Sequence, residues 1–321
     1  MNALPIADVL SALDAGLDAS LARLAALIAI PSISTDPAYN HECVRAAEWL
    51  AADLSAIGFE ASVRKTTGQP KVVAHMSGPK GAPHILFYGH YDVQPVDPLE
   101  LWTSSPFASS VVESQNGKVI TGRGAADDKG QLMTFVEACR AWKNVTGNLP
   151  VSVTILFEGE EESGSPSLQP FLMANADELK ADAAFVCDTN MWDENTPSIS
   201  TGLRGMVGEE IVITAANRDL HSGYFGGAAA NPIHILAKIL ADMRDDTGRV
   251  TIPGFYDGVT ETPDTVKTMW AGLGRSDEAF LNEVGLSIPA GEQGRSVLEL
   301  TWARPTLEVN GITGGYTGPG F

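Results

Sequence analysis

The strongest constraint on the fold is an apolar run that ends abruptly in a group of acids. Residues 150–157 read PVSVTILF, which is typical of a buried strand, and residues 158–165 read EGEEESGS. Two other apolar runs, HILFYG and AAFVC, lead into His90 and Asp188. Like charges repel most strongly where the dielectric constant is low, so carboxylates placed side by side at the end of a buried strand call for a positive partner.

Helical patterns alternate with these strands. CVRAAEWLAADLSAI (43–57) and QLMTFVEACRAW (131–142) carry apolar residues at helical spacing, and ASVRKT (61–66) and KVVAHMS (71–77) predict further strands. A polar loop is expected from about residue 94 to residue 122. Alternating strands and helices predict an α/β sandwich with a mostly parallel sheet.

The pattern changes near Gly205, and we predict a domain boundary there, between residues 1–205 and residues 206–321. MVGEEIVITAA (206–216) predicts a strand with one solvated face, and NPIHILAKILADMRDD predicts a helix, followed by an acidic, loop-rich tract. The second part therefore predicts a smaller α+β domain.

Composition excludes several classes of partner. Lys and Arg number 21 and Asp and Glu number 40, which gives a net charge of −19. Nucleic acids and anionic membrane surfaces both attract clustered basic residues, so neither is an expected partner. Three scattered cysteines form no CxxC motif and no disulfide framework, and the N-terminus lacks the pattern of a signal peptide, which favours a cytoplasmic location.

Polar clusters follow three of the predicted strands. In GHYDVQP, His90 and Asp92 are two residues apart, so on a strand they face the same side, and Asp92 could orient His90 as a metal ligand. A core histidine satisfied by a neighbouring acid is the alternative. In GRGAADDKGQ, Asp127 and Asp128 open a helix, where an aspartate can also serve as a simple N-cap.

The third cluster is the group of glutamates itself. Its alternative interpretation is an exposed acidic loop, and for Glu160 we expect that interpretation to hold. The carboxyl ends of parallel strands meet at one edge of a sheet, so the three clusters predict an imidazole and several carboxylates in one place. A pair of divalent cations would relieve their repulsion, and these ligands suit Zn²⁺ first, with Mn²⁺ or Co²⁺ as alternatives.

Six motifs occur in an order that resembles the M20 metallopeptidase family: HYDVQP, GRGAADDKGQ, EGEEESGS, the strand-end Asp188, GLRG and DLHSGYFGG. The similarity is greatest to the dipeptidase branch, which includes carnosinase-like and Cys-Gly dipeptidases. It implies a catalytic α/β/α domain in residues 1–205, and a lid and dimerisation domain in residues 206–321.

The resemblance also implies a role for individual residues. The metal ligands it implies are His90, Asp127, Glu162 and Asp188, with Asp127 bridging two metals. Asp92 would orient His90, and Asp128 would be a spectator beside a cis peptide bond. Glu161 would be the general base, and His221 would polarise the scissile carbonyl. Gly226, Gly227 and Asn231 would shape the loop after His221 and cap the helix that begins at Pro232.

The expected function is hydrolysis of the amide bond of a dipeptide or short peptide by a water held between two metals, in a homodimer formed through the lid domain. Glu161 would deprotonate that water and return the proton to the leaving amine. The resemblance also implies a last metal-ligand histidine near the family's C-terminus, which this sequence lacks. We therefore expect a C-terminally truncated, poorly active form with an incomplete sheet.

Two alternatives stay open. An N-acyl amino acid amidohydrolase, a desuccinylase or a carboxypeptidase could use the same scaffold. A metal-binding protein without catalysis would need the ligands but not Glu161.

Overall fold

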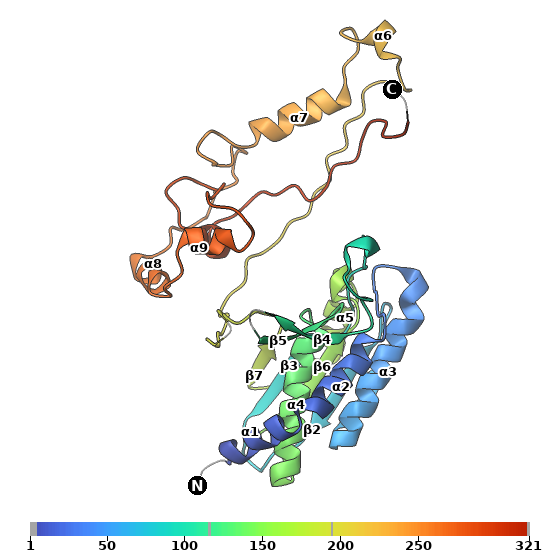
Figure 1. Ribbon diagram of the computed structural model, residues 1–321, viewed down its shortest axis with the longest axis vertical. Coiled ribbons are helices and arrows are strands. Elements are labelled where there is room, and N and C mark those ends of the chain that lie inside the picture. Colours follow the sequence, from blue (N-terminus) through green and yellow to red (C-terminus); the bar gives the residue numbers. More distant parts are fainter. Residues whose placement is uncertain (1–4, 115–116, 194, 320–321) are drawn as a thin grey trace. The chain divides into compact units, whose positions relative to one another are not determined.

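The computed structural model describes residues 5–114, 117–193 and 195–319. Contacts within the chain divide it into two units, Met1–Ser198 and Ile199–Phe321, and Figure 1 colours both along the sequence. The first unit carries the α/β architecture, and the second is mostly helix and irregular chain. The functional assignment of residues 1–205 and 206–321 as catalytic and lid domains stays a prediction.

A five-stranded sheet forms the centre of the first unit, in the order β1, β2, β6, β3, β7. The strands are β1 (Glu60–Arg64), β2 (Lys71–Met76), β3 (His84–His90), β6 (Ser152–Glu158) and β7 (Ala183–Val186). β3 pairs in parallel with both β6 and β7, whereas β2 is antiparallel to β1 and β6. Only β2 is therefore reversed among these strands, and the predicted α/β fold with a mostly parallel sheet is confirmed.

Three helices supply the core of one sheet face: α2 (Leu17–Ile28), α3 (Asn40–Ile57) and α4 (Lys129–Thr146). A further helix, α1 (Ile6–Ala15), packs on α4. In Figure 1 these helices lie together over the sheet. α3 packs on β1 and β2, and α4 packs on β3. Alternate strand residues such as Phe87 and Ile155 enter this main core. The opposite face buries a smaller cluster with α5 (Leu168–Ala174).

The polar segment from residue 94 to residue 122 contains structure that we expected to be loop. β4 (Ser110–Ser114) and β5 (Gly117–Thr121) pair as an antiparallel two-stranded sheet. The signal was present in the Asn-Gly pair between two β-branched stretches, which favours a hairpin. Short 3₁₀ turns at Pro37–Tyr39, Leu99–Leu101 and Glu161–Ser163 complete the first unit.

The second unit contains α6 (Ser222–Phe225), α7 (Pro232–Asp242), α8 (Asp264–Ala271), α9 (Asp277–Asn282) and a π-helical turn at Glu299–Ala303. The strand expected at residues 206–216 is wrong, because the backbone there forms no ladder with any described residue. A strand depends on a partner for its backbone hydrogen bonds. Apolar side chains in this stretch are accordingly exposed, with Met206 95% and Val207 85% accessible.

Every helix among the described residues is too short or too polar to cross a lipid bilayer.

Candidate metal centre

The candidate site forms where the parallel strands end. His90 is the last residue of β3, Glu158 is the last residue of β6, and Asp188 follows β7 by two residues. Asp127 lies just before α4, whose first residue is Lys129. Ligands of α/β proteins bind at this edge of the sheet, because the loops that carry polar residues all leave there.

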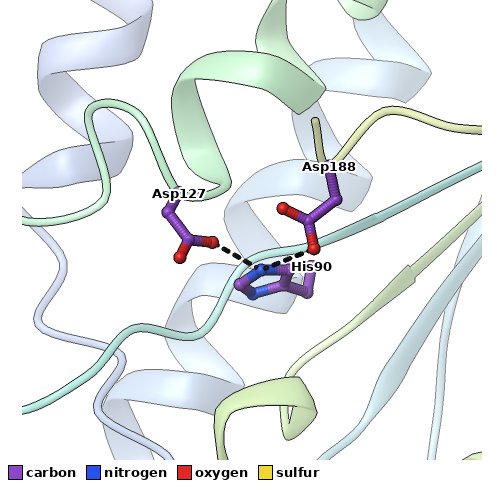
Figure 2. A group of neighbouring side chains, drawn as sticks. All are labelled: His90, Asp127 and Asp188. Atoms are coloured by element: carbon purple, nitrogen blue, oxygen red, sulfur yellow. Dashed lines mark hydrogen bonds and ion pairs between the residues drawn. The ribbon is translucent and has the colours of Figure 1, made fainter. Parts of the chain in front are cut away.

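Figure 2 shows the central geometry, with Asp127 and Asp188 on either side of the His90 ring. Nε2 of His90 lies 2.9 Å from Oδ1 of Asp127 and 3.7 Å from Oδ2 of Asp188. One ligand atom from each of the three residues lies within 4.8 Å of the others. Oε2 of Glu161 is 4.0 Å from the same nitrogen. The structure thus brings one imidazole and three carboxylates together from four separate segments.

Asp92 lies behind the imidazole and links it to the glutamate loop. Its Oδ1 is 3.3 Å from Nδ1 of His90, and both side chains are almost completely buried. The backbone N–H groups of Glu161 and Glu162 donate to Asp92 at 3.2 and 3.0 Å. The Ser34 hydroxyl donates to the same carboxylate at 2.5 Å. One buried carboxylate therefore fixes the ring of His90 and the start of the loop that carries Glu161 and Glu162.

Asp128, which we expected to be a spectator beside the metal ligands, is not among the residues whose ligand atoms converge, but it has a structural contact with His90. The backbone N–H of His90 donates to Oδ2 of Asp128 at 2.9 Å, and Asp128 is completely buried. A Cβ at Gly89 would lie 2.8 Å from this oxygen, so the close approach requires glycine there. The peptide bond between Asp127 and Asp128 is cis, as the resemblance implied. Asp128 therefore holds the end of β3 against the start of α4.

Glu162 lies at the side of this group. Its carboxylate accepts a hydrogen bond from Nε2 of Gln94 at 2.7 Å, and it is not among the three residues whose ligand atoms converge. Burial raises the pKa of Glu162, the bond from Gln94 opposes that rise, and the charge of Asp127 adds to it. Its assignment as a metal ligand stays a prediction.

The electrostatics of the group favour a cation. Burial raises the pKa of Glu161 and of Asp188, and neighbouring carboxylates add to the rise. Burial alone would lower the pKa of His90, but the hydrogen bond and charge of Asp92, with Asp128 and Glu161, raise it to about 10. So many carboxylates around one imidazole create a strong preference for positive charge, and nitrogen and oxygen donors of this kind fit a divalent metal ion.

The interpretation of Glu160 as an exposed loop residue is wrong. Glu160 is 2% exposed and forms an ion pair with Lys71, with 3.0 Å between Nζ and Oε1. Lys71 also pairs with Glu158 at 3.0 Å. Sequence analysis missed Lys71, although a lysine that opens the apolar strand KVVAHM was a usable signal, since a lysine is almost never fully buried without a partner.

His221 lies in the second unit, just before α6, and is exposed. Its Nδ1 accepts a hydrogen bond from the backbone N–H of Gly223 at 2.9 Å. The predicted cap by Asn231 is confirmed, because its Oδ1 accepts from the N–H of Ile233 at 2.9 Å at the start of α7. The catalytic role of His221 stays a prediction.

Comparison with known proteins identifies the family of this chain. The model of peptidase family M20/M25/M40 matches residues 86–316. Cys-Gly metallodipeptidase dug1 of Schizosaccharomyces pombe is 31% identical over 320 residues, which cover 96% of this chain and 67% of that protein. Beta-Ala-His dipeptidase of Mus musculus is 28% identical over 253 residues, covering 78% of this chain and 51% of the mouse protein.

Solved structures give the same result. The dipeptidase Dug1p of Saccharomyces cerevisiae superposes with a TM-score of 0.78 at 25% identity, covering 98% of this chain and 68% of that one. Human carnosine dipeptidase 1 shares the fold, with a TM-score of 0.79 at 24% identity, over 99% of this chain and 69% of the human chain. The chain spans about two thirds of the length of the S. pombe relative and of both solved structures. Because the family model matches most of the length of this chain, the chain belongs to peptidase family M20/M25/M40.

Proposed function

We propose that this protein is a metal-dependent dipeptidase that hydrolyses the amide bond of dipeptides or short peptides. The observation that carries the proposal is the convergence of Asp127, Asp188 and Glu161 within 4.0 Å of Nε2 of His90 at the carboxyl edge of the sheet. The similarity to Cys-Gly and beta-Ala-His dipeptidases supports the substrate class.

We propose two divalent cations, with Zn²⁺ as the first candidate and Mn²⁺ or Co²⁺ as alternatives. His90, Asp127 and Asp188 would hold one ion, and Asp127 and Glu162 would hold the other. Bound there, the ions would act as Lewis acids and make a water molecule a nucleophile near neutral pH.

The chain's own residues then have distinct tasks. Glu161 is assigned as the general base: it is partly exposed, its backbone is fixed by Asp92, and burial raises its pKa towards the range useful for proton transfer. It would take the proton of the attacking water and deliver it to the leaving amine. Asp92 would keep the His90 ring in one orientation, and His221 is proposed to polarise the scissile carbonyl.

A substrate panel tests this proposal and its nearest rival together. Protein loaded with Zn²⁺, Mn²⁺ or Co²⁺ is assayed with Cys-Gly, β-Ala-His, N-acetyl amino acids and N-succinyl amino acids. Hydrolysis of the dipeptides alone supports a dipeptidase, and preference for the acylated substrates would favour the amidohydrolase alternative.

Glu161→Ala separates catalysis from metal binding. We expect the variant to bind metal in a calorimetric titration and to lose hydrolysis. Equal hydrolysis by the variant and the unchanged protein would contradict the proposed mechanism. If both proteins bind metal and neither hydrolyses a substrate, a metal-binding protein without catalysis would be favoured.

We also propose a homodimer formed through residues 206–321, a cytoplasmic location, and neither nucleic acid nor membrane as a partner. All three cysteines, Cys43, Cys139 and Cys187, are free thiols, which supports a reducing compartment. Light scattering after size-exclusion chromatography tests the dimer, and a monomeric mass at micromolar concentration would contradict it.

A further inference from the structure

A buried ammonium group lies behind the candidate metal centre, and the proposed mechanism does not use it. Lys71 is the first residue of β2 and is 0% exposed. Its Nζ lies 3.0 Å from Oε2 of Glu158 and 3.0 Å from Oε1 of Glu160. Both partners are also buried, so one positive charge is shared by two carboxylates in a low-dielectric environment.

Glu160 is fixed at both of its carboxylate oxygens. Besides Lys71, Oε1 accepts hydrogen bonds from the backbone N–H of Ser167, at 2.8 Å, and from the Ser167 hydroxyl. Oε2 accepts from the backbone N–H of Gln69 at 2.8 Å. A Cβ at Gly68 would lie 1.8 Å from Oε2, so the backbone before β2 packs directly against this carboxylate. The side chain of Glu160 therefore has essentially one available position.

Glu158 and the neighbouring Tyr91 join the same assembly. The hydroxyl groups of Tyr88 and Ser165 donate to the second oxygen of Glu158. The backbone carbonyl of Glu158 accepts from the N–H of Tyr91 at 2.8 Å, and the Tyr91 hydroxyl donates to the carbonyl of Pro70 at 2.6 Å. Lys71 thus contacts Glu158 at the end of β6 directly, and Pro70 is linked to the same residue through Tyr91.

The loop that follows is held from two sides. Glu160 precedes Glu161 directly, and its carboxylate is held by Lys71, whereas the N–H groups of Glu161 and Glu162 are held by Asp92. The backbone carbonyl of Glu160 also accepts from the N–H groups of Ser163 and Ser165 at 3.2 and 2.8 Å. The carboxylate of Glu160 is therefore the buried side-chain anchor on the N-terminal side of Glu161 and Glu162, and Asp92 holds their backbone N–H groups.

We propose that Lys71 is a positioning residue for the hydrolysis: by anchoring Glu160 it fixes the backbone that presents Glu161 and Glu162 to the metal centre. This inference rests on the proposed function. It differs from a purely structural role, because it requires the geometry of the site to change in variants that are still folded.

Two variants and a control test it in the full chain. Lys71→Met removes the ammonium group, and Glu160→Gln keeps Lys71 paired with Glu158 but places an amide nitrogen where one of the bonded oxygens lies. Lys80→Met changes an exposed lysine a short distance along the chain and is the matched control. Each folded protein, checked by circular dichroism, is titrated with Co²⁺, whose absorption spectrum reports ligand geometry, and is assayed with Cys-Gly.

We expect a changed cobalt spectrum and a kcat lower by about tenfold to a hundredfold in Lys71→Met and Glu160→Gln, with KM nearly constant. Lys80→Met should match the unchanged protein. If Lys71→Met does not fold, Glu160→Gln decides the outcome alone.

Folded variants with an unchanged spectrum and unchanged kcat would overturn the inference. If the unchanged protein binds Co²⁺ without hydrolysing any dipeptide, the proposed function fails and the spectrum still decides the role of Lys71. Absence of cobalt binding in the unchanged protein would overturn both.

Discussion

Two pairs of carboxylates within five residues differ sharply in their surroundings. Glu158 and Glu160 are buried at the back of the site, and both pair with the ammonium group of Lys71. Each also accepts hydrogen bonds from other donors. Glu161 and Glu162 lie at the front, partly exposed, among further acids and one imidazole. The back pair is compensated by a buried ammonium group, whereas the front pair has His90 as its positive neighbour and still has raised pKa values.

The pKa of Glu160 is lowered and the pKa of Glu161 is raised, in keeping with the same difference. Burial alone would raise the pKa of Glu160, but the bonds from Ser167, Lys71 and Gln69 lower it below its ordinary value. For Glu161, burial raises the pKa and the charges of Glu162 and Asp188 raise it further. Glu160 and Glu161 are adjacent and of the same type, but the charges beside them differ. Glu160 is therefore suited to stabilising the fold, and Glu161 to proton transfer.

The largest expected effect is on the front pair. Glu161→Gln should lower kcat for dipeptide hydrolysis by about 10²- to 10⁴-fold, the range of general-base catalysis. Stability of the metal-free protein should stay equal or rise, because one like charge is removed from the cluster. Thermal melting measured beside the kinetics checks both, and a clear loss of stability would mean that the front and back pairs do not differ as described.

The back pair should respond in the opposite way. Lys71→Met should lower the free energy of unfolding by about 3–5 kcal/mol, the usual cost of breaking a buried ion pair. Lys71 is one of the groups that lower the pKa of Glu160, so this pKa should rise in the variant. Part of the lost stability should therefore return as the pH falls and Glu160 binds a proton. Urea unfolding at several pH values tests this, and a pH-independent loss would contradict it.

Metal addition should act on the front pair only. At a metal concentration about 100 times Kd, binding should stabilise the folded chain by about 2.7 kcal/mol. A His90→Ala variant should lose most of this gain, whereas the Lys80→Met control should keep it. Differential scanning calorimetry with and without Zn²⁺ measures the shift, and an equal shift in His90→Ala would place the metal elsewhere.

The smallest expected effect concerns Glu137, an acid in α4 compensated in the same way as the back pair. Burial alone would raise its pKa, but hydrogen bonds from Arg23 and Ser20 and the charge of Arg140 lower it. Its folded pKa is depressed, so its contribution is present above the ordinary value of 4.5 and is lost as the pH falls through the lower folded value.

Glu137→Gln should therefore lower stability by about 2 kcal/mol at neutral pH, the range of a charge-assisted hydrogen bond, and by less near pH 3. Urea titrations at the two pH values measure the difference. The same loss at both would show that packing, rather than charge, explains the effect.

The sequence by itself determined the alternation of strands and helices and the position of polar clusters at the ends of β3, β6 and β7. These features follow from local periodicity and from the rule that parallel strands end at one edge, so they need no knowledge of distant contacts. The meeting of His90 with Asp127 and Asp188 was predictable for this reason, although which atoms converge was not.

Only the tertiary structure decided which acids are paired inside the protein. Lys71 and Glu160 are 89 positions apart, and no local pattern reports a pairing across β2 and β6. Asp128 likewise acquired its role from the backbone N–H of His90, 38 positions away. The stretch 206–216 has the periodicity of a strand but pairs with no strand among the residues that the structure describes. A strand needs a neighbour for its backbone hydrogen bonds, and periodicity does not show whether one is present.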